Sequence, residues 1–158
     1  MAVSEIKKVF QLGIVVDDAL AAAQSACELF ALDPESIQYV DLSEYAAPVL
    51  YKGQETRSYL KLAMVNVAGL EFEFIQFVGG DANSHKDFYD KNGPGLQHIC
   101  VAVDDYAGAV KRMEELGAVP LIEGGSDETG YYKYMDMRAQ NGLIIELYDE
   151  KLSGSKAM

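Results

Sequence analysis

Four residues whose side chains can bind a metal ion occupy matching points of two similar parts of the sequence. Gln11 begins the segment QLGIVVDD, and His98 begins the similar segment HICVAVDD (offset 98 − 11 = 87). Glu73 ends the segment GLEFE, and Glu146 ends the similar segment GLIIE (offset 146 − 73 = 73). An internal repeat brings equivalent positions together about a pseudo-twofold axis. Two carboxylates, one imidazole and one carboxamide are therefore expected to converge on one divalent metal ion.

The elements that must position these residues follow one order twice. The patterns of the first copy predict a strand at 8–16, a helix at 19–32, a strand at 36–42 and a hairpin of strands at 58–67 and 70–77. A short helix at 85–91, capped by Ser84, is expected between the copies. The second copy predicts a strand at 96–103, a helix from 105 to about 116, and strands at 119–123, 130–137 and 143–149.

Strand alternation places small residues beside both first-strand candidates. Gln11 shares a strand face with Gly13 and Val15, and His98 shares one with Cys100 and Ala102. These small side chains leave room for a metal ion and its ligands.

Each βαβββ copy is too small to bury its sheet alone. We therefore expect an α+β protein in which tandem modules form one curved, eight-stranded mixed sheet around a metal cleft, with the helices outside. The 158 residues form one domain, with module 1 at about 8–78, a linker at about 79–94, module 2 at about 95–150 and a disordered tail at 151–158.

The charge excludes several classes of partner. A net charge of −12 and a pI near 4.4 argue against nucleic acid and against anionic membrane surfaces, because both require basic patches. The sequence shows no signal peptide and no apolar run of membrane-spanning length. Cys27 and Cys100 lack metal or redox spacing and are expected to be reduced core residues. These features favour a cytoplasmic protein with a small-molecule substrate.

The duplicated βαβββ order, with the segments GPGLQHICVAVDD (93–105) and NGLIIEL (141–147), resembles the vicinal oxygen chelate superfamily. This superfamily includes glyoxalase I, methylmalonyl-CoA epimerase, extradiol dioxygenases, and fosfomycin-resistance and bleomycin-binding proteins. The resemblance covers roughly residues 8–150, and the first segment looks especially like the epimerase branch. It implies a glyoxalase-like fold and, often, a homodimer.

The resemblance also implies a ligand set. The metal positions of the family fall on Gln11, Glu73, His98 and Glu146, and a Gln-Glu-His-Glu set is like that of zinc-type glyoxalases. Such donors suit Zn²⁺, Ni²⁺, Co²⁺ or Mn²⁺. In related isomerases the position of Glu146 acts as the general base. A second acid/base glutamate of epimerases has only Glu44 and Glu55 as candidates here, and neither lies in a counterpart motif.

The leading functional prediction is a metal-dependent isomerase or epimerase that abstracts a proton next to a carbonyl of an acyl thioester or dicarbonyl. A glyoxalase I-type lyase ranks second, because Val15 replaces an arginine of bacterial glyoxalases and RAQNG (138–142) replaces their turn. An extradiol dioxygenase ranks third, because Gln11 removes one of two histidines. A non-enzymatic protein that binds a drug or metabolite is the remaining class.

Each candidate also has a structural interpretation. Gln11 and His98 could be hydrogen-bonded core residues, and Glu146 a solvated residue at a strand end. Glu71 competes with Glu73, because residues two apart on a strand share a face. His85 is expected at the surface of the linker. An aromatic and thioether-rich strand is expected to pack in the sheet, where its inward members could also line the cleft: Tyr131, Tyr132, Tyr134, Met135 and Met137.

Overall fold

The chain follows the predicted order of elements, with additions. The computed structural model describes residues 6–149. The first copy comprises β1 (Ile6–Val15), α1 (Ala19–Phe30), the short 3₁₀ helix η1 (Pro34–Ser36), β2 (Gln38–Leu42), β3 (Val49–Tyr51), β4 (Gln54–Thr56), β5 (Ser58–Val67) and β6 (Leu70–Gly80). Helix α2 (Ser84–Asn92) follows. The second copy comprises β7 (Gly95–Val103), α3 (Tyr106–Glu115), β8 (Val119–Ser126), β9 (Gly130–Met137), α4 (Arg138–Asn141) and β10 (Leu143–Asp149).

The prediction of eight strands is wrong, because the mixed sheet formed by residues 6–149 has ten. The additional strands, β3 and β4, form a hairpin whose turn is made by Lys52 and Gly53, with φ angles of 50° and 81°. Positive φ at both central residues is the requirement of a type I′ hairpin turn. Each strand has only three residues, too few for alternation to be visible in the sequence.

An Asp-Asp pair precedes each of the two main helices, α1 and α3. The side chain of Asp18 accepts a hydrogen bond from the backbone N–H of Ala21, and that of Asp105 accepts one from Gly108. The end of α1 comes two residues before the predicted position, because Ala31 adopts a left-handed conformation (φ 54°). Its N–H then bonds to carbonyl groups of the last turn and closes the helix.

The described residues divide into two compact units, and the division falls within β1 and β7. The first unit comprises Gln11–Pro48 and Thr56–Gln97. The second unit comprises the described residues up to Phe10, Val49–Glu55, and the chain from His98 onward.

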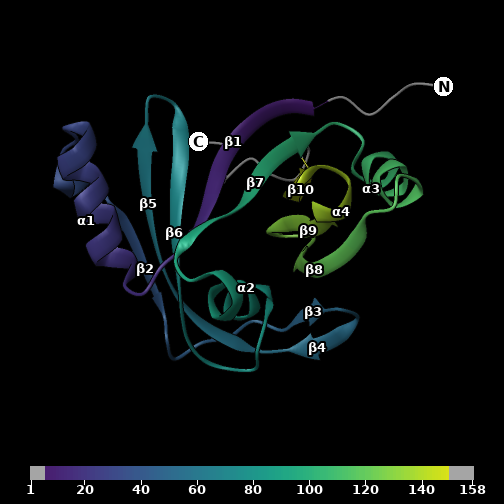
Figure 1. Ribbon diagram of the computed structural model, residues 1–158, viewed down its shortest axis with the longest axis horizontal. Coiled ribbons are helices and arrows are strands. Elements are labelled where there is room, and N and C mark those ends of the chain that lie inside the picture. The colour runs from purple at the N-terminus through teal and green to yellow at the C-terminus, as the bar shows by residue number, and fades with distance from the viewer. Residues whose placement is uncertain (1–5, 150–158) are drawn as a thin grey trace. The chain divides into compact units, whose positions relative to one another are not determined.

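The first unit has the strand order β2-β5-β6-β1, in which β1 and β6 are parallel. Helix α1 packs against β5 and β6 on one face of these strands (Figure 1). Its buried positions are mostly alanine, so the helix lies close to the sheet. The core of this unit consists of Ala19, Ala23, Ala26, Cys27, Ala63, Val65 and Phe74.

The second unit repeats that order as β8-β9-β10-β7, with β7 and β10 parallel. Helix α3 covers one face of these strands (Figure 1), and β3 adds to the outer edge of β8. The core of this unit consists of Val101, Val103, Ala109, Ala118, Met135, Met137 and Leu147. The duplication inferred from the sequence is therefore present in the strand order.

Both cysteines are buried in the core, as predicted, and they form no disulfide bond with each other. No helix among the described residues is long and apolar enough to cross a membrane. The tail predicted to be disordered, 151–158, lies outside the described residues.

Candidate metal site

The first unit brings Gln11 together with two glutamates. The Nε2 atom of Gln11 donates to Glu73 Oε2 at 2.5 Å and to Glu71 Oε1 at 2.6 Å. Gln11 is only 2% exposed, whereas both glutamates are partly exposed. Glu71 and Glu73 lie on one face of β6, as the two-residue spacing requires.

The second unit brings His98 together with Glu146. The Nε2 atom of His98 lies 3.2 Å from Glu146 Oε2, and the two residues are 2% and 3% exposed. The prediction that Glu146 could be a solvated residue at a strand end is therefore wrong. Its position within the buried end of β10 is fixed by pairing with β7 on one side and β9 on the other.

The two pairs occupy the same register of their parallel strands. Gly13 pairs with Glu73 between β1 and β6, and Cys100 pairs with Glu146 between β7 and β10. Glu73 is therefore opposite Gly13, and Glu146 is opposite Cys100. The polar residue two positions before each of these small residues, Gln11 or His98, is diagonal to the glutamate. Gln11 with Glu73 and His98 with Glu146 are equivalent in register as well as in sequence.

The structure does not place the four predicted ligands in one group. Gln11 and Glu73 belong to the first compact unit, and His98 and Glu146 belong to the second. Within residues 6–149, no three or more His, Cys, Asp or Glu side chains are arranged to hold a metal ion. Convergence of the four on one ion stays a prediction.

The donor chemistry of the pairs nevertheless fits a divalent metal. Two ligand atoms that are each about 2.1 Å from one ion are separated by about 3 to 3.4 Å. The His98–Glu146 separation of 3.2 Å falls in this range. A buried carboxylate also requires a positive partner, because an unpaired charge in the interior costs several kcal/mol. In the first pair, the carboxamide oxygen of Gln11 and the carboxylate of Glu73 are the available donors.

Two tyrosine rings lie beside the His98–Glu146 pair. Tyr134 pairs with Glu146 across β9 and β10, and its ring centroid is 4.5 Å from that of His98. Tyr132 lies next to Tyr134, with centroids 6.2 Å apart. Met135 and Met137, in contrast, belong to the core under α3. Alternation along β9 therefore separates Tyr132 and Tyr134 from Met135 and Met137, and Tyr134 packs against the imidazole.

Burial and three carboxylates of the second unit act on Tyr106, which begins α3. The pKa of Tyr106 is raised first by burial and then by the carboxylates of Glu123, Asp149 and Glu146. A phenol resists ionisation where negative charge is already present.

The prediction that His85 lies at the surface is wrong. His85 is 5% exposed, and its Nδ1 is 2.8 Å from Gln97 Oε1. The Nε2 atom of Gln97 donates to the carbonyl oxygen of Ser84, so the oxygen of this amide is the atom that faces the imidazole. His85 therefore carries a proton on Nδ1. The short sequence around it has no apolar periodicity that would have revealed this burial.

The cap of helix α2 also differs from the prediction. Asn83, rather than Ser84, accepts a hydrogen bond from the backbone N–H of Lys86. Asn83 and Ser84 are both buried, at 3% and 5% exposure. The cap, His85 and Gln97 thus form a buried polar group at the start of α2.

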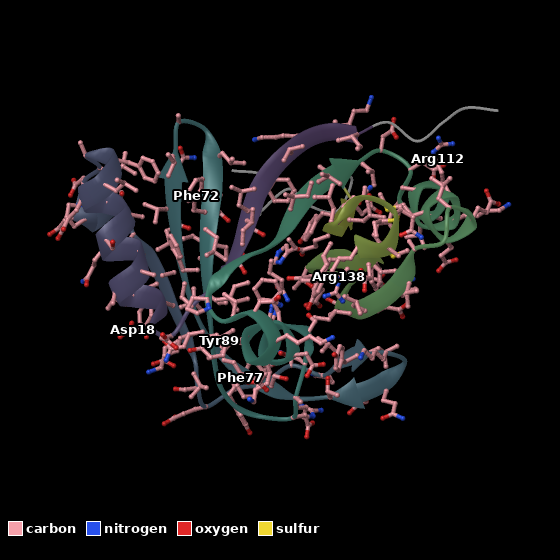
Figure 2. All side chains as sticks on the ribbon, viewed as in Figure 1. Asp18, Phe72, Phe77, Tyr89, Arg112 and Arg138 are labelled. Atoms are coloured by element: carbon pink, nitrogen blue, oxygen red, sulfur yellow. The ribbon has the colours of Figure 1, made fainter. Side chains whose placement is uncertain are left out.

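A pocket of about 190 Å³ opens in the first unit where the parallel strands β1 and β6 end beside α2. Its lining residues are Val15, Val16, Asp17, Phe77, Lys86, Tyr89 and Asp90. Figure 2 shows Phe77 and Tyr89 close together beside α2. The hydroxyl of Tyr89 donates to Asp17, which raises the pKa of this tyrosine. None of the four predicted ligands lines this pocket.

Comparison with known protein families identifies the chain. The family model of the glyoxalase/bleomycin resistance protein/dioxygenase superfamily matches residues 10–134. The chain belongs to this superfamily. The resemblance drawn from the repeated segments, and the glyoxalase-like fold that it implied, are thereby confirmed. No curated protein sequence matches the chain.

Solved structures with this fold include two methylmalonyl-CoA epimerases. The one from Mycobacterium tuberculosis has a TM-score of 0.61 and 18% identity, over 94% of this chain and 91% of that chain. The one from Streptomyces coelicolor, in complex with 2-nitronate-propionyl-CoA, has a TM-score of 0.61 and 14% identity, over 96% and 97%. A hypothetical protein from Bacillus halodurans has a TM-score of 0.63 and 14% identity, over 90% and 94%. At these identities the similarity establishes the fold.

Proposed function

We propose that this superfamily member is a metal-dependent isomerase or epimerase that abstracts a proton next to a carbonyl group. The observation that carries the proposal is the equivalence of the two side-chain pairs. Gln11 with Glu73 and His98 with Glu146 have the same register on parallel strands and the residue types of metal ligands. A repeat that keeps polar ligand types at matching, largely buried points is unusual for residues that only fill a core.

The four side chains have two proposed roles, binding of the metal ion and transfer of the proton. The Gln11 carboxamide oxygen, the carboxylates of Glu73 and Glu146, and the His98 imidazole are the residues that would hold the ion. A divalent metal bound there acts as a Lewis acid and stabilises negative charge that develops on a substrate oxygen. Glu146 is assigned the transfer of the proton, as this position does in the isomerases that the chain resembles. Tyr134 excludes water from the His98–Glu146 pair by its ring contact.

An acyl thioester is the first substrate class to test. The fold is shared with epimerases, and the Streptomyces coelicolor enzyme was solved with 2-nitronate-propionyl-CoA. A dicarbonyl is the second class, because the Gln-Glu-His-Glu set is like that of zinc-type glyoxalases. The net charge of −12 gives no general attraction for a polyanionic thioester, so binding of such a substrate requires local cationic groups.

The proposal is tested by exchange of the substrate proton with solvent deuterium. Protein loaded with Zn²⁺, Ni²⁺, Co²⁺ or Mn²⁺ is incubated in deuterium oxide with methylmalonyl-CoA, and separately with a glyoxalase I substrate. Deuterium incorporation is followed by mass spectrometry. We expect incorporation by the wild type and a loss of at least about 100-fold in Glu146→Gln, because general-base catalysis contributes about 10²–10⁴-fold.

Glu114→Gln is the matched control. Glu114 is exposed on α3 and is outside the proposed site, so this variant should exchange at the wild-type rate. Equal exchange by wild type and Glu146→Gln would contradict the role of Glu146. Absence of exchange by every metal-loaded form with both substrates would contradict the isomerase proposal and leave a small-molecule binding protein.

A further inference from the structure

Glu71 has no counterpart in the second copy of the repeat. The offset that places Glu146 on Glu73 places Ile144 on Glu71 (146 − 73 = 144 − 71). Glu71 is the direct partner of Gln11 in the register of β1 and β6, and its Oε1 is 2.6 Å from Gln11 Nε2. The first copy therefore has a carboxylate where the second copy has an isoleucine.

The contacts of Gln11 fix which end of its amide faces the glutamates. An ionised carboxylate can only accept hydrogen bonds, so the atom that lies between Glu71 and Glu73 is the NH₂ nitrogen. The carbonyl oxygen, Oε1, can make no hydrogen bond with an ionised carboxylate. It is the only atom of this side chain that can bind a cation.

The carboxamide at position 11 explains why the first copy needs such a partner. A carboxamide can flip about its terminal C–C bond and exchange its oxygen for a nitrogen that binds no cation. The imidazole of His98 can bind a cation through whichever ring nitrogen is unprotonated, and its orientation is set by the partner of the other nitrogen. A carboxylate that ligates a metal has fewer lone pairs left to accept hydrogen bonds from a neighbour. Glu73 alone would therefore hold the Gln11 amide in one orientation only weakly.

We propose that Glu71 is a positioning residue, whose carboxylate holds the Gln11 amide so that Oε1 is presented to the metal. The inference rests on the proposed metal centre. Glu71 acts on the metal only by orienting Gln11, whereas Glu73 is itself a ligand. Partners of ligand side chains commonly contribute a factor of about 10–100 to metal affinity.

The test is a double-mutant cycle on metal affinity. Binding of Co²⁺ is measured by competition with a chromophoric chelator, and the visible spectrum of bound Co²⁺ is recorded. Glu71→Ile, which copies the second repeat, should weaken binding by about 10–100-fold. Glu71→Gln keeps an oxygen that can accept from Gln11 Nε2 and should weaken binding by less than about tenfold. In a Gln11→Ala background, Glu71→Ile should have almost no further effect, because no side chain at position 11 then needs orientation.

The outcomes separate this inference from the proposed function. An equal loss from Glu71→Ile with Gln11 and with Gln11→Ala would show that Glu71 acts on the metal without Gln11 and would overturn the inference. Unchanged affinity and spectrum in Glu71→Ile would overturn it as well, while the metal centre stands. A wild type that binds no Co²⁺ overturns the metal centre first, and the inference with it. Circular dichroism of each variant establishes that the compared proteins are folded.

Discussion

The Nε2 atom of His98 lies 3.2 Å from the Oε2 atom of Glu146, and both side chains are almost completely buried. A carboxylate at 3% exposure is stabilised by a positive partner, because an unpaired charge in the interior is costly. A divalent ion held by His98 and Glu146 would supply that positive charge, and a neutral imidazole is the form that ligates metals.

The buried group at the start of α2 is expected to contribute measurably to stability. Gln97→Leu removes the acceptor of the His85 Nδ1–H and the donor to the Ser84 carbonyl. A buried polar group that loses its partner costs about 1–3 kcal/mol. We expect the free energy of unfolding, measured in urea, to fall by about that amount in Gln97→Leu.

Gln97→Glu keeps the acceptor for His85 but replaces the donor to Ser84 by an oxygen. Its buried carboxylate faces the Ser84 carbonyl oxygen, so it should cost at least as much as Gln97→Leu at neutral pH. A Gln97→Leu protein as stable as the wild type would mean that the network contributes nothing.

The sequence was sufficient to predict most of the fold because the informative pattern was repeated. The matched segments around Gln11 and His98 predicted two strand–helix units, and the structure has them at β1–α1 and β7–α3. The two glutamates were aligned by sequence spacing alone, and the strand registers of Glu73 and Glu146 agree with that alignment. Long alternating strands and paired aspartates are local signals, so they can be read without the tertiary structure.

Other features depend on contacts that no local pattern encodes. The β3–β4 hairpin has very short strands, and β3 is held by pairing with β8, which belongs to the second copy of the repeat. His85 is buried because Gln97 comes to it from β7. The contact of Gln11 with both Glu71 and Glu73 depends on the register between the parallel strands β1 and β6, which the sequence does not show. From sequence spacing alone, the two glutamates were alternative candidates.

The ion pair between Asp136 and Arg138 predicts a dependence of stability on pH. The Arg138 guanidinium makes two hydrogen bonds to this carboxylate, at 2.8 and 2.9 Å, and lowers the pKa of Asp136. Figure 2 shows the location of Arg138. Because the folded-state pKa is below the unfolded value, the contribution is complete above the unfolded pKa and is lost as the pH falls through the folded one.

Arg138→Gln should therefore reduce the free energy of unfolding at pH 7 by up to about 1 kcal/mol, the range for a solvent-exposed pair. The difference from wild type should shrink as the pH is lowered below about 4. Arg112→Gln, at an exposed position of α3, is the control and should show no such dependence. A difference at Arg138 that is equal at pH 7 and pH 3 would rule out this ion pair as the cause.

The C-terminus of α1 offers a stabilising substitution. Ala31 has φ 54°, a conformation that costs a residue with a Cβ roughly 1–2 kcal/mol and that glycine adopts freely. We expect Ala31→Gly to raise the free energy of unfolding by up to about 1 kcal/mol, the remainder being offset by the greater entropy of the unfolded glycine. Thermal and urea unfolding measure the gain.

The same substitution inside the helix should have the opposite sign. Ala21 is exposed within α1, so Ala21→Gly should destabilise by roughly 1 kcal/mol. A loss at both positions would show that the left-handed conformation of Ala31 carries no cost in this protein.

The equivalent pairs Gln11–Glu73 and His98–Glu146 are proposed to bind one metal ion. The metal content of protein purified without chelator is measured by mass spectrometry, beside His98→Ala and Glu146→Ala. We expect about one divalent ion per wild-type chain, lost in both variants, because each removes one of four ligands. A wild type that holds no metal, even after addition of Zn²⁺, Ni²⁺, Co²⁺ or Mn²⁺, or variants that hold as much as the wild type, would contradict this proposal.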